Sequence, residues 1–116
     1  MKLQEIVKNL GLEVLVKSNT FDQQIVEGVY VCDLLSNVMA HGRENDLWIT
    51  IQTHQNILAV ASLLNFSAIL LPENLNPDRE TLMKAEKENI ILLKSSQTAF
   101  TLAGQLYELG LRGERG

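Results

Sequence analysis

The sequence contains one cysteine and two histidines, residue types that often serve as nucleophile, base or metal ligand. Cys32 and His54 each follow an apolar run, so they could pair as nucleophile and base if those runs are neighbouring strands. A free cysteine at the end of a strand is more often a small buried apolar residue, and we expect Cys32 to be structural. His41 and His54 are too few for a structural zinc site, and the sequence lacks the glycine-rich phosphate-binding motifs. We therefore expect no catalytic residue, no metal and no cofactor.

Polar residues gather at the points where apolar runs end, and they suit binding better than catalysis. Hydroxyl and amide side chains beside helix starts, where backbone N–H groups point outward, favour a small anion. The same residue types are common N-caps, and capping by Thr53, Asn76 or Ser96 accounts for them without a ligand. If a ligand binds, we expect it to be small and anionic and to contact Thr53, His54, Asn74, Ser95 and Ser96.

Apolar periodicity indicates a regular alternation of helices and strands around these polar positions. Helices are expected over residues 2–10, after an Asp33 cap, after a Thr53 cap, from Asn76-Pro77 to Glu88-Asn89, and after Ser95 or Ser96. Runs of β-branched and apolar residues predict strands over residues 13–16, 25–32, 46–52, 67–71 and 90–93. From residue 29 onward, strand and helix therefore alternate without interruption.

This alternation predicts an α/β fold, in which a single domain holds a mostly parallel sheet of four to five strands with helices on both faces. The link between the first two strands is short and not helical, so an antiparallel pair is an alternative to a parallel one, and the sequence leaves the orientation of the first strand open. The domain is expected to span residues 1–111, with residues 112–116 as a frayed tail. The carboxyl ends of parallel strands meet at one edge of the sheet, where a ligand would bind.

Composition narrows the classes of partner. The chain has 116 residues and a net charge of −4, and its lysines and arginines are scattered rather than gathered in a stripe. Nucleic acid is therefore not an expected partner, because phosphate binding needs clustered cations. The longest apolar runs fall short of the roughly 18 residues that cross a membrane, and the amino-terminus lacks the apolar segment of a signal peptide. We expect a soluble cytoplasmic protein that does not bind a membrane.

Three stretches of the sequence resemble the DRTGG domain family. They are GVYVCDLLSNVMAHGRENDLWITIQTHQNILAVASLL, SAILLPENLNPDRETLMKAEKENIILL and SSQTAFTLAGQLYELGL, and together they extend from about residue 28 to residue 111. The DLWITIQTH core and the LYELG ending are similar to the small standalone members. The sequence departs from the family at two places. Residues 53–56 stand where the family has its Asp-Arg turn, and residues 72–75 stand where it has its Thr-Gly-Gly loop.

The resemblance implies a regulatory module rather than an enzyme. Members of the family occur beside CBS domains, phosphate acetyltransferase domains and P-loop kinase-like proteins, and they are similar to the non-catalytic N-terminal domain of HPr kinase. The resemblance also implies a homodimer, and an apolar fraction of 46% is generous for so small a chain. For the interface we expect a helical stripe and an exposed tryptophan, comprising Leu34, Leu35, Val38, Met39 and Trp48.

Two functions are compatible with these features. The first is a non-catalytic regulatory or interaction module that acts as a homodimer and has a protein as a possible further partner. The alternative is a sensor that binds a small anion or nucleotide at the carboxyl edge of the sheet.

Overall fold

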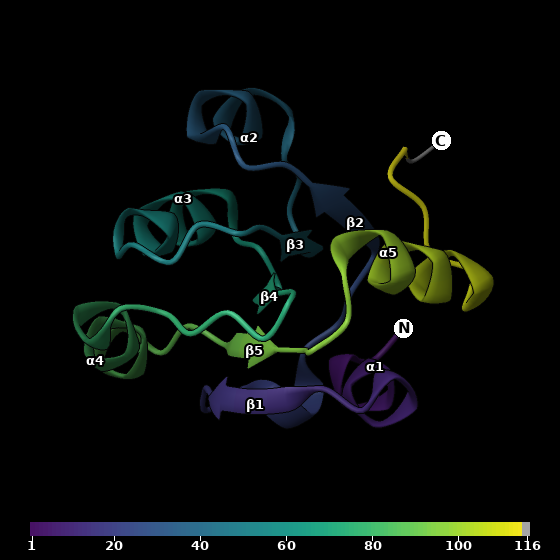
Figure 1. Ribbon diagram of the computed structural model, residues 1–116, viewed down its shortest axis with the longest axis horizontal. Coiled ribbons are helices and arrows are strands. Elements are labelled where there is room, and N and C mark those ends of the chain that lie inside the picture. Colours follow the sequence, from purple (N-terminus) through teal and green to yellow (C-terminus); the bar gives the residue numbers. More distant parts are fainter. Residues whose placement is uncertain (115–116) are drawn as a thin grey trace.

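The apolar runs form a single five-stranded sheet in the computed structural model, which describes residues 1–114 (Figure 1). The strands are β1 (Glu13–Val16), β2 (Gly28–Val31), β3 (Asp46–Ile49), β4 (Ala68–Leu71) and β5 (Leu92–Lys94). The helices are α1 (Leu3–Leu10), α2 (Leu35–His41), α3 (Asn56–Leu64), α4 (Arg79–Glu88) and α5 (Ala99–Glu108), and a short 3-10 helix, η1, covers Phe21–Gln23. The α/β fold predicted from the sequence is confirmed.

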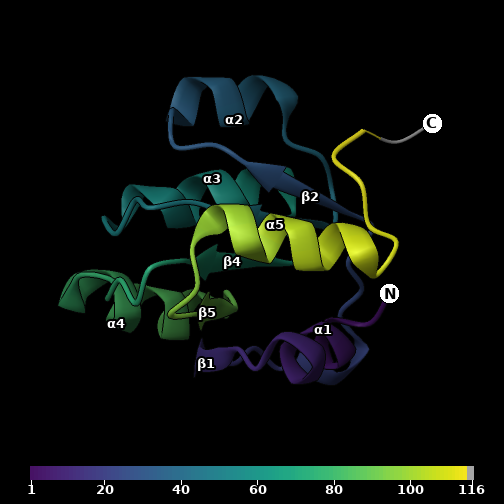
Figure 2. The ribbon, with the colours of Figure 1, turned by 45° about the vertical axis from the view of Figure 1, so that its right-hand side comes forward.

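The sheet has the order β1-β5-β4-β3-β2, and strands β2 to β5 are parallel. Because these four strands lie in sequence order, the helices that connect them return on the same side of the sheet. Helices α2, α3 and α4 pack on that face through side chains such as Val38, Ile57 and Ala85. Helices α1 and α5 cover the other face through Leu3 and Leu102 (Figures 1 and 2). Helices therefore lie on both faces, as predicted.

β1 is antiparallel, a direction that the sequence leaves open, and its partner is β5 rather than β2. The connecting segment 17–27 runs from β1 at one edge of the sheet to β2 at the other. On its way the Asn19 amide N donates to Asn89 Oδ1 at 2.9 Å, and Gln24 Nε2 donates to Ser67 Oγ at 3.3 Å. Four strand spacings amount to about 19 Å, which this segment spans easily when extended. A short link therefore does not require the two strands that it joins to pair.

Trp48 is fully buried, so the prediction of an exposed tryptophan is wrong. It lies on β3, which is flanked by β2 and β4 and covered by helices on both faces. Its indole Nε1 donates to the Cys32 carbonyl at 2.9 Å, and its ring centroid is 5.6 Å from that of Phe66. Val38 is also fully buried. Neither side chain can contribute to a surface between two copies, and Leu34, Leu35 and Met39 are what remains of the predicted interface.

Arg112, which the sequence places in a frayed tail, is instead bonded to the edge of the sheet. The Val29 amide N donates to the Arg112 carbonyl at 3.0 Å, and Arg112 Nη1 donates to the carbonyls of Tyr107 and Leu111. The bond from Val29 covers part of the outer edge of β2, where unpaired backbone groups would otherwise pair with another strand. Residues 115–116 of the predicted tail lie outside the described residues.

Candidate functional site at the carboxyl edge of the sheet

The carboxyl ends of β2 to β5 meet at one edge, and the loops that follow them hold the residues predicted to bind a ligand (Figure 2). These loops comprise residues 32–34, 50–55, 72–78 and 95–98. Helix α4 leaves β4 toward one face of the sheet, whereas α5 leaves β5 toward the other, so the last two loops diverge. Such a divergence between neighbouring strands is where parallel sheets usually bind ligands.

Asn74 and Ser95, two of the predicted ligand residues, are neighbours at this divergence. Glu73 and Asn74 have left-handed backbone conformations, with φ of 59° and 58°, which turn the loop toward β5. The Glu73 amide N donates to the Gln97 carbonyl and the Asn74 amide N to the Ser95 carbonyl, each at 2.8 Å. Ser95 Oγ accepts from the Gln97 amide N at 3.0 Å. These groups therefore bind the two loops to each other and narrow the opening between them.

Lys94 places a cation at the same point. Its Nζ donates to Asn76 Oδ1, which links β5 to the loop after β4. Asn76 is therefore not the cap of α4, as the sequence predicts, because the cap position is Asp78. The helix begins later because the loop first contacts its other neighbour, where the Asp78 amide N donates to the Thr53 carbonyl at 3.1 Å.

Thr53 lies beside the start of α4 and does not cap α3. Its carbonyl also accepts from Thr81 Oγ1 at 2.8 Å, and its Oγ1 donates to Asp78 Oδ1 at 3.4 Å. α3 begins at Asn56, and its cap position is Gln55, which makes no side-chain cap bond. The predicted Thr53 cap is wrong because residue 53 is still bonded to the loop after β4, and the chain turns into α3 only after residue 55.

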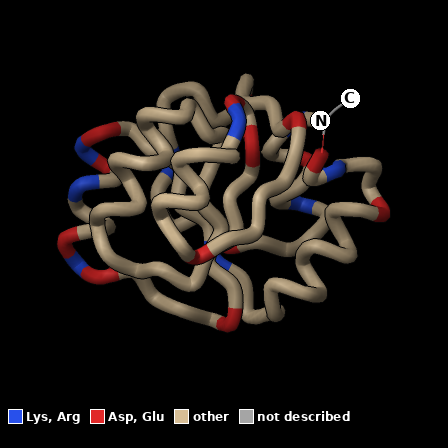
Figure 3. Tube along the Cα trace, turned by 90° about the horizontal axis from the view of Figure 1, so that it is seen from above, with Lys and Arg blue, Asp and Glu red and all other residues tan. Residues whose placement is uncertain are grey.

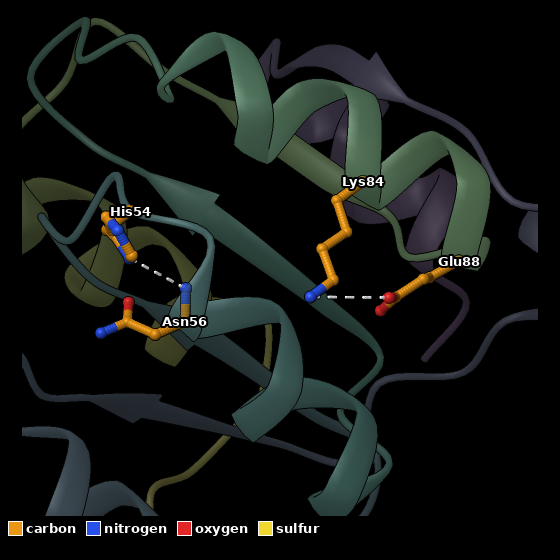
Figure 4. Close-up of polar contacts among 4 residues, drawn as sticks. All are labelled: His54, Asn56, Lys84 and Glu88. Carbon is orange, nitrogen blue, oxygen red and sulfur yellow. Dashed lines mark hydrogen bonds and ion pairs between the residues drawn. The ribbon is translucent and has the colours of Figure 1, made fainter.

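His54 is exposed, and its ring faces the start of α3. Its Nδ1 accepts a hydrogen bond from the Asn56 amide N at 3.2 Å (Figure 4). That contact occupies one of the helix-terminal N–H groups that an anion would otherwise use. The same view shows Lys84 and Glu88 on α4, an exposed pair at 3.8 Å of the kind that contributes little to stability.

Ser96 is exposed, and α5 is capped by Thr98 rather than by Ser95 or Ser96. Thr98 Oγ1 accepts from the Thr101 amide N at 3.2 Å. Gln97 has a buried Oε1 that finds no hydrogen-bond partner within the described residues. Most buried acceptors in proteins are satisfied by a protein donor or an ordered water, so this oxygen is a position where a water or a ligand donor would be stabilised.

Asp33 lies at this edge of the sheet, but it does not cap α2 as the sequence predicts. The cap position of α2 is Leu34. Asp33 Oδ1 accepts from Thr50 Oγ1 at 2.9 Å and from the Ile51 amide N at 2.8 Å, and its carbonyl accepts from Gln52 Nε2 at 2.9 Å. Asp33 lies two residues after β2 and Thr50 directly after β3, and they meet because β2 and β3 pair in parallel.

Within the described residues, Cys32 and His54 are bonded to other groups rather than to each other. Cys32 Sγ is 3.4 Å from Asn37 Nδ2 and 3.8 Å from the Leu34 carbonyl, while His54 is held by Asn56. Residues 1–114 contain no group of three His, Cys, Asp or Glu side chains arranged to hold a metal, and no helix long and apolar enough to cross a membrane. Lys and Arg positions are interspersed with Asp and Glu along the trace (Figure 3).

A hollow of about 170 Å³ lies at the opposite edge, where the parallel strands begin. Its walls carry hydroxyl and amide side chains, among them Ser18, Gln24 and Asn89. Ser67, which also lines it, is bonded to Gln24 and to the Ile25 carbonyl. These side chains fasten the crossing segment 17–27 to the sheet, so we assign them a structural role.

Comparison with known proteins places the chain in a family. A model of the DRTGG domain matches residues 5–109. The chain belongs to the DRTGG domain family. No curated protein sequence matches it at a significant level.

The fold of this DRTGG domain is similar to one in a crystal structure from Clostridium perfringens. That structure contains the CBS and DRTGG domains of the regulatory region of a pyrophosphatase, complexed with its activator diadenosine tetraphosphate. The two align with a TM-score of 0.71 and 20% sequence identity over 90% of this chain and 45% of the other. The present chain thus spans just under half the length of that structure, and the likeness shows a shared fold.

Proposed function

We propose that this DRTGG domain is a non-catalytic regulatory module that self-associates as a homodimer and acts in the cytoplasm. The observation that supports the non-catalytic part of this proposal is the use of the polar groups at the carboxyl edge. Asp33 joins the loops after β2 and β3, Thr53 joins those after β3 and β4, and Asn74 joins those after β4 and β5. Groups engaged in this way hold loops in register and are not aligned for catalysis. A similarity to the non-catalytic N-terminal domain of HPr kinase is part of the same proposal.

Self-association predicts a melting temperature that depends on protein concentration. A dimer whose subunits unfold as they separate is stabilised by mass action, so the melting temperature should rise by about 5 °C between about 1 and 100 μM. Differential scanning calorimetry of the full chain measures this directly. A melting temperature that stays constant over that range would contradict the homodimer.

A second candidate function is a sensor for a small anionic ligand. Lys94 lies beside the divergence of the last two loops, and Ser96 is exposed there. The activator in the Clostridium perfringens complex is a nucleotide with a polyphosphate chain. The ligand residues that we propose remain Thr53, His54, Asn74, Ser95 and Ser96, with Lys94 as the main cation.

Calorimetric titration with diadenosine tetraphosphate, ATP and inorganic phosphate tests the sensor. Lys94→Met should weaken binding at least about tenfold, since it removes a charge-assisted contact, and a Thr53→Ala, Ser96→Ala double variant should weaken it as well. Lys84→Met on α4 is the matched control and should bind like the wild type. If none of the three compounds binds, or if all variants bind equally, the sensor is rejected and the regulatory module that self-associates is the remaining proposal.

A further inference from the structure

The outer surface of α5 is unusually apolar for a helix that faces solvent. Its inner side buries Leu102 and Leu106 against the sheet. On its outer side Phe100 is 89% exposed, more than any other large apolar residue among those described, and Tyr107 is 60% exposed. Single exposed apolar residues are common on protein surfaces, so the neighbours of these two rings decide whether they form a patch.

The neighbours are apolar as well. Val31, at the end of the edge strand β2, is 49% exposed and lines a shallow hollow together with Ala103 and Tyr107. α5 lies alongside β2 in both ribbon views (Figures 1 and 2). The guanidinium of Arg112 lies 3.6 Å from the Tyr107 ring centroid and borders this surface. We call the surface formed by Val31, Phe100, Ala103, Gly104 and Tyr107 the α5 patch.

Gly104 has no explanation within a single copy. It lies in the middle of α5, and a Cβ built on it would meet no atom within 4 Å. Glycine inside a helix is less stable than alanine because it loses more backbone freedom on folding. A residue without a side chain at an outward position instead permits another backbone to approach closely.

The charges on α5 point to a protein partner. α5 carries one charged residue, Glu108 at its carboxyl end, whereas α4, of equal length, carries six in RETLMKAEKE. The cores of protein interfaces are depleted of charge and enriched in aromatic residues. The α5 patch has that composition, and the outer surface of α4 does not.

The spacing within the patch identifies the partner as a second copy. Phe100 comes three residues before Ala103, and Tyr107 comes three residues after Gly104, so two large rings flank a small central pair on the same side of the helix. In a two-fold interface whose axis is perpendicular to the helix, the same surface meets itself in the opposite direction, so a ring at one end of the helix meets what lies at the other end of its partner. Two antiparallel α5 helices that cross at Ala103 and Gly104 satisfy this, with each Phe100 beside the Tyr107 of the other copy.

We propose that the α5 patch is the surface through which two copies of this chain pair, with the α5 helices antiparallel and in contact at Gly104. The proposal rests on the self-association proposed above and assigns it to a surface. It replaces the surface on α2 that the sequence predicts. Of that surface Leu34 remains 65% exposed and Met39 39% exposed, so the α2 surface is the alternative that an experiment must separate from the α5 patch.

Sedimentation velocity of the full chain over a range of concentrations tests the assignment. Phe100→Asp should raise the dimer dissociation constant by about 100-fold or more, as for an interface hot spot. Gly104→Leu should do the same by blocking the crossing, while the single copy stays folded because the added side chain points into open space. Met83→Ser on α4, where the methionine is 62% exposed, and Leu34→Ser on α2 are controls that should leave the constant unchanged.

The outcomes separate this inference from the proposal on which it rests. If the wild type sediments as one chain at every concentration, both fail. If the wild type is a dimer and remains one in Phe100→Asp and Gly104→Leu, the α5 patch is not the interface, and a loss of dimer in Leu34→Ser would assign α2 instead. Circular dichroism on dilute samples checks that each variant is folded. If Phe100→Asp is not folded, the dimer dissociation constant of Gly104→Leu alone decides whether the α5 patch is the interface.

Discussion

At the scale of single residues, the carboxyl edge of the sheet is organised by side-chain oxygens that bond to a neighbouring loop. Asp33 shows this most clearly, because its carboxylate accepts from the hydroxyl of Thr50, a residue that is only 1% exposed. Thr53 Oγ1 likewise donates to Asp78 in the neighbouring loop, whereas Ser95 Oγ accepts from Gln97 within its own loop. A polar residue placed after a strand looks the same in sequence whether it binds a ligand or a loop. Only the pairing of the strands shows which partner it reaches.

Replacing Asp33 should destabilise the domain without changing its fold. Asp33→Ala leaves the buried Thr50 hydroxyl and the Ile51 amide without their acceptor, which should lower the free energy of unfolding by about 1–2 kcal/mol. Glu86→Ala, on the exposed side of α4, should change it by less than about 0.5 kcal/mol. Urea unfolding measures both variants. A loss in Asp33→Ala no greater than that in Glu86→Ala would show that the carboxylate does not hold the loops.

Cys32 should be replaceable by serine. Its Sγ is partly buried and lies 3.4 Å from Asn37 Nδ2, a contact that a serine hydroxyl can still accept. We expect Cys32→Ser to fold, to keep the oligomeric state of the wild type and to lose about 1 kcal/mol or less of unfolding free energy. Urea unfolding and sedimentation check both points. A variant that lost a measurable enzymatic turnover would overturn the structural assignment of this thiol.

At the scale of elements, the sequence predicts which helices and strands exist but places the helix starts too early. The predicted caps Thr53, Asn76 and Ser96 are each followed two residues later by the observed cap positions, which are Gln55, Asp78 and Thr98. The shift has a common cause at the first two, because each loop contacts its neighbour before it turns into a helix. Capping preferences depend only on residues close in the sequence and take no account of contacts between loops. The sequence alone therefore could not locate the first residues of these helices.

The corrected cap of α5 can be tested by a matched pair of substitutions. Thr98→Ala removes the acceptor for the Thr101 amide N and should cost about 1 kcal/mol of unfolding free energy. Ser96→Ala alters an exposed hydroxyl two residues earlier and should change it by less than about 0.5 kcal/mol. Thermal or urea unfolding distinguishes the two. The opposite ranking would restore the cap that the sequence predicts.

At the scale of the whole molecule, the order of the strands decides what is buried and what is exposed. Trp48 resembles a surface tryptophan in the sequence, but the central position of β3 buries it on the α2, α3 and α4 face. α5 crosses to the other face beside the edge strand β2, where Phe100 and Val31 remain exposed. The alternation of strands and helices predicts the fold class. It does not predict that β1 pairs with β5, the pairing that leaves β2 at the other edge of the sheet. The sequence alone therefore could not show that α5 lies beside an edge strand.

Self-association is the central claim, and sedimentation equilibrium of the full chain tests it most directly. We predict that the mass at micromolar concentration is twice the 13.0 kDa of one chain and that it falls toward 13.0 kDa on dilution. The mass measured this way does not depend on the shape of the particle or on which surface forms the interface. A mass of 13.0 kDa at every concentration would contradict the homodimer and leave a monomeric DRTGG domain.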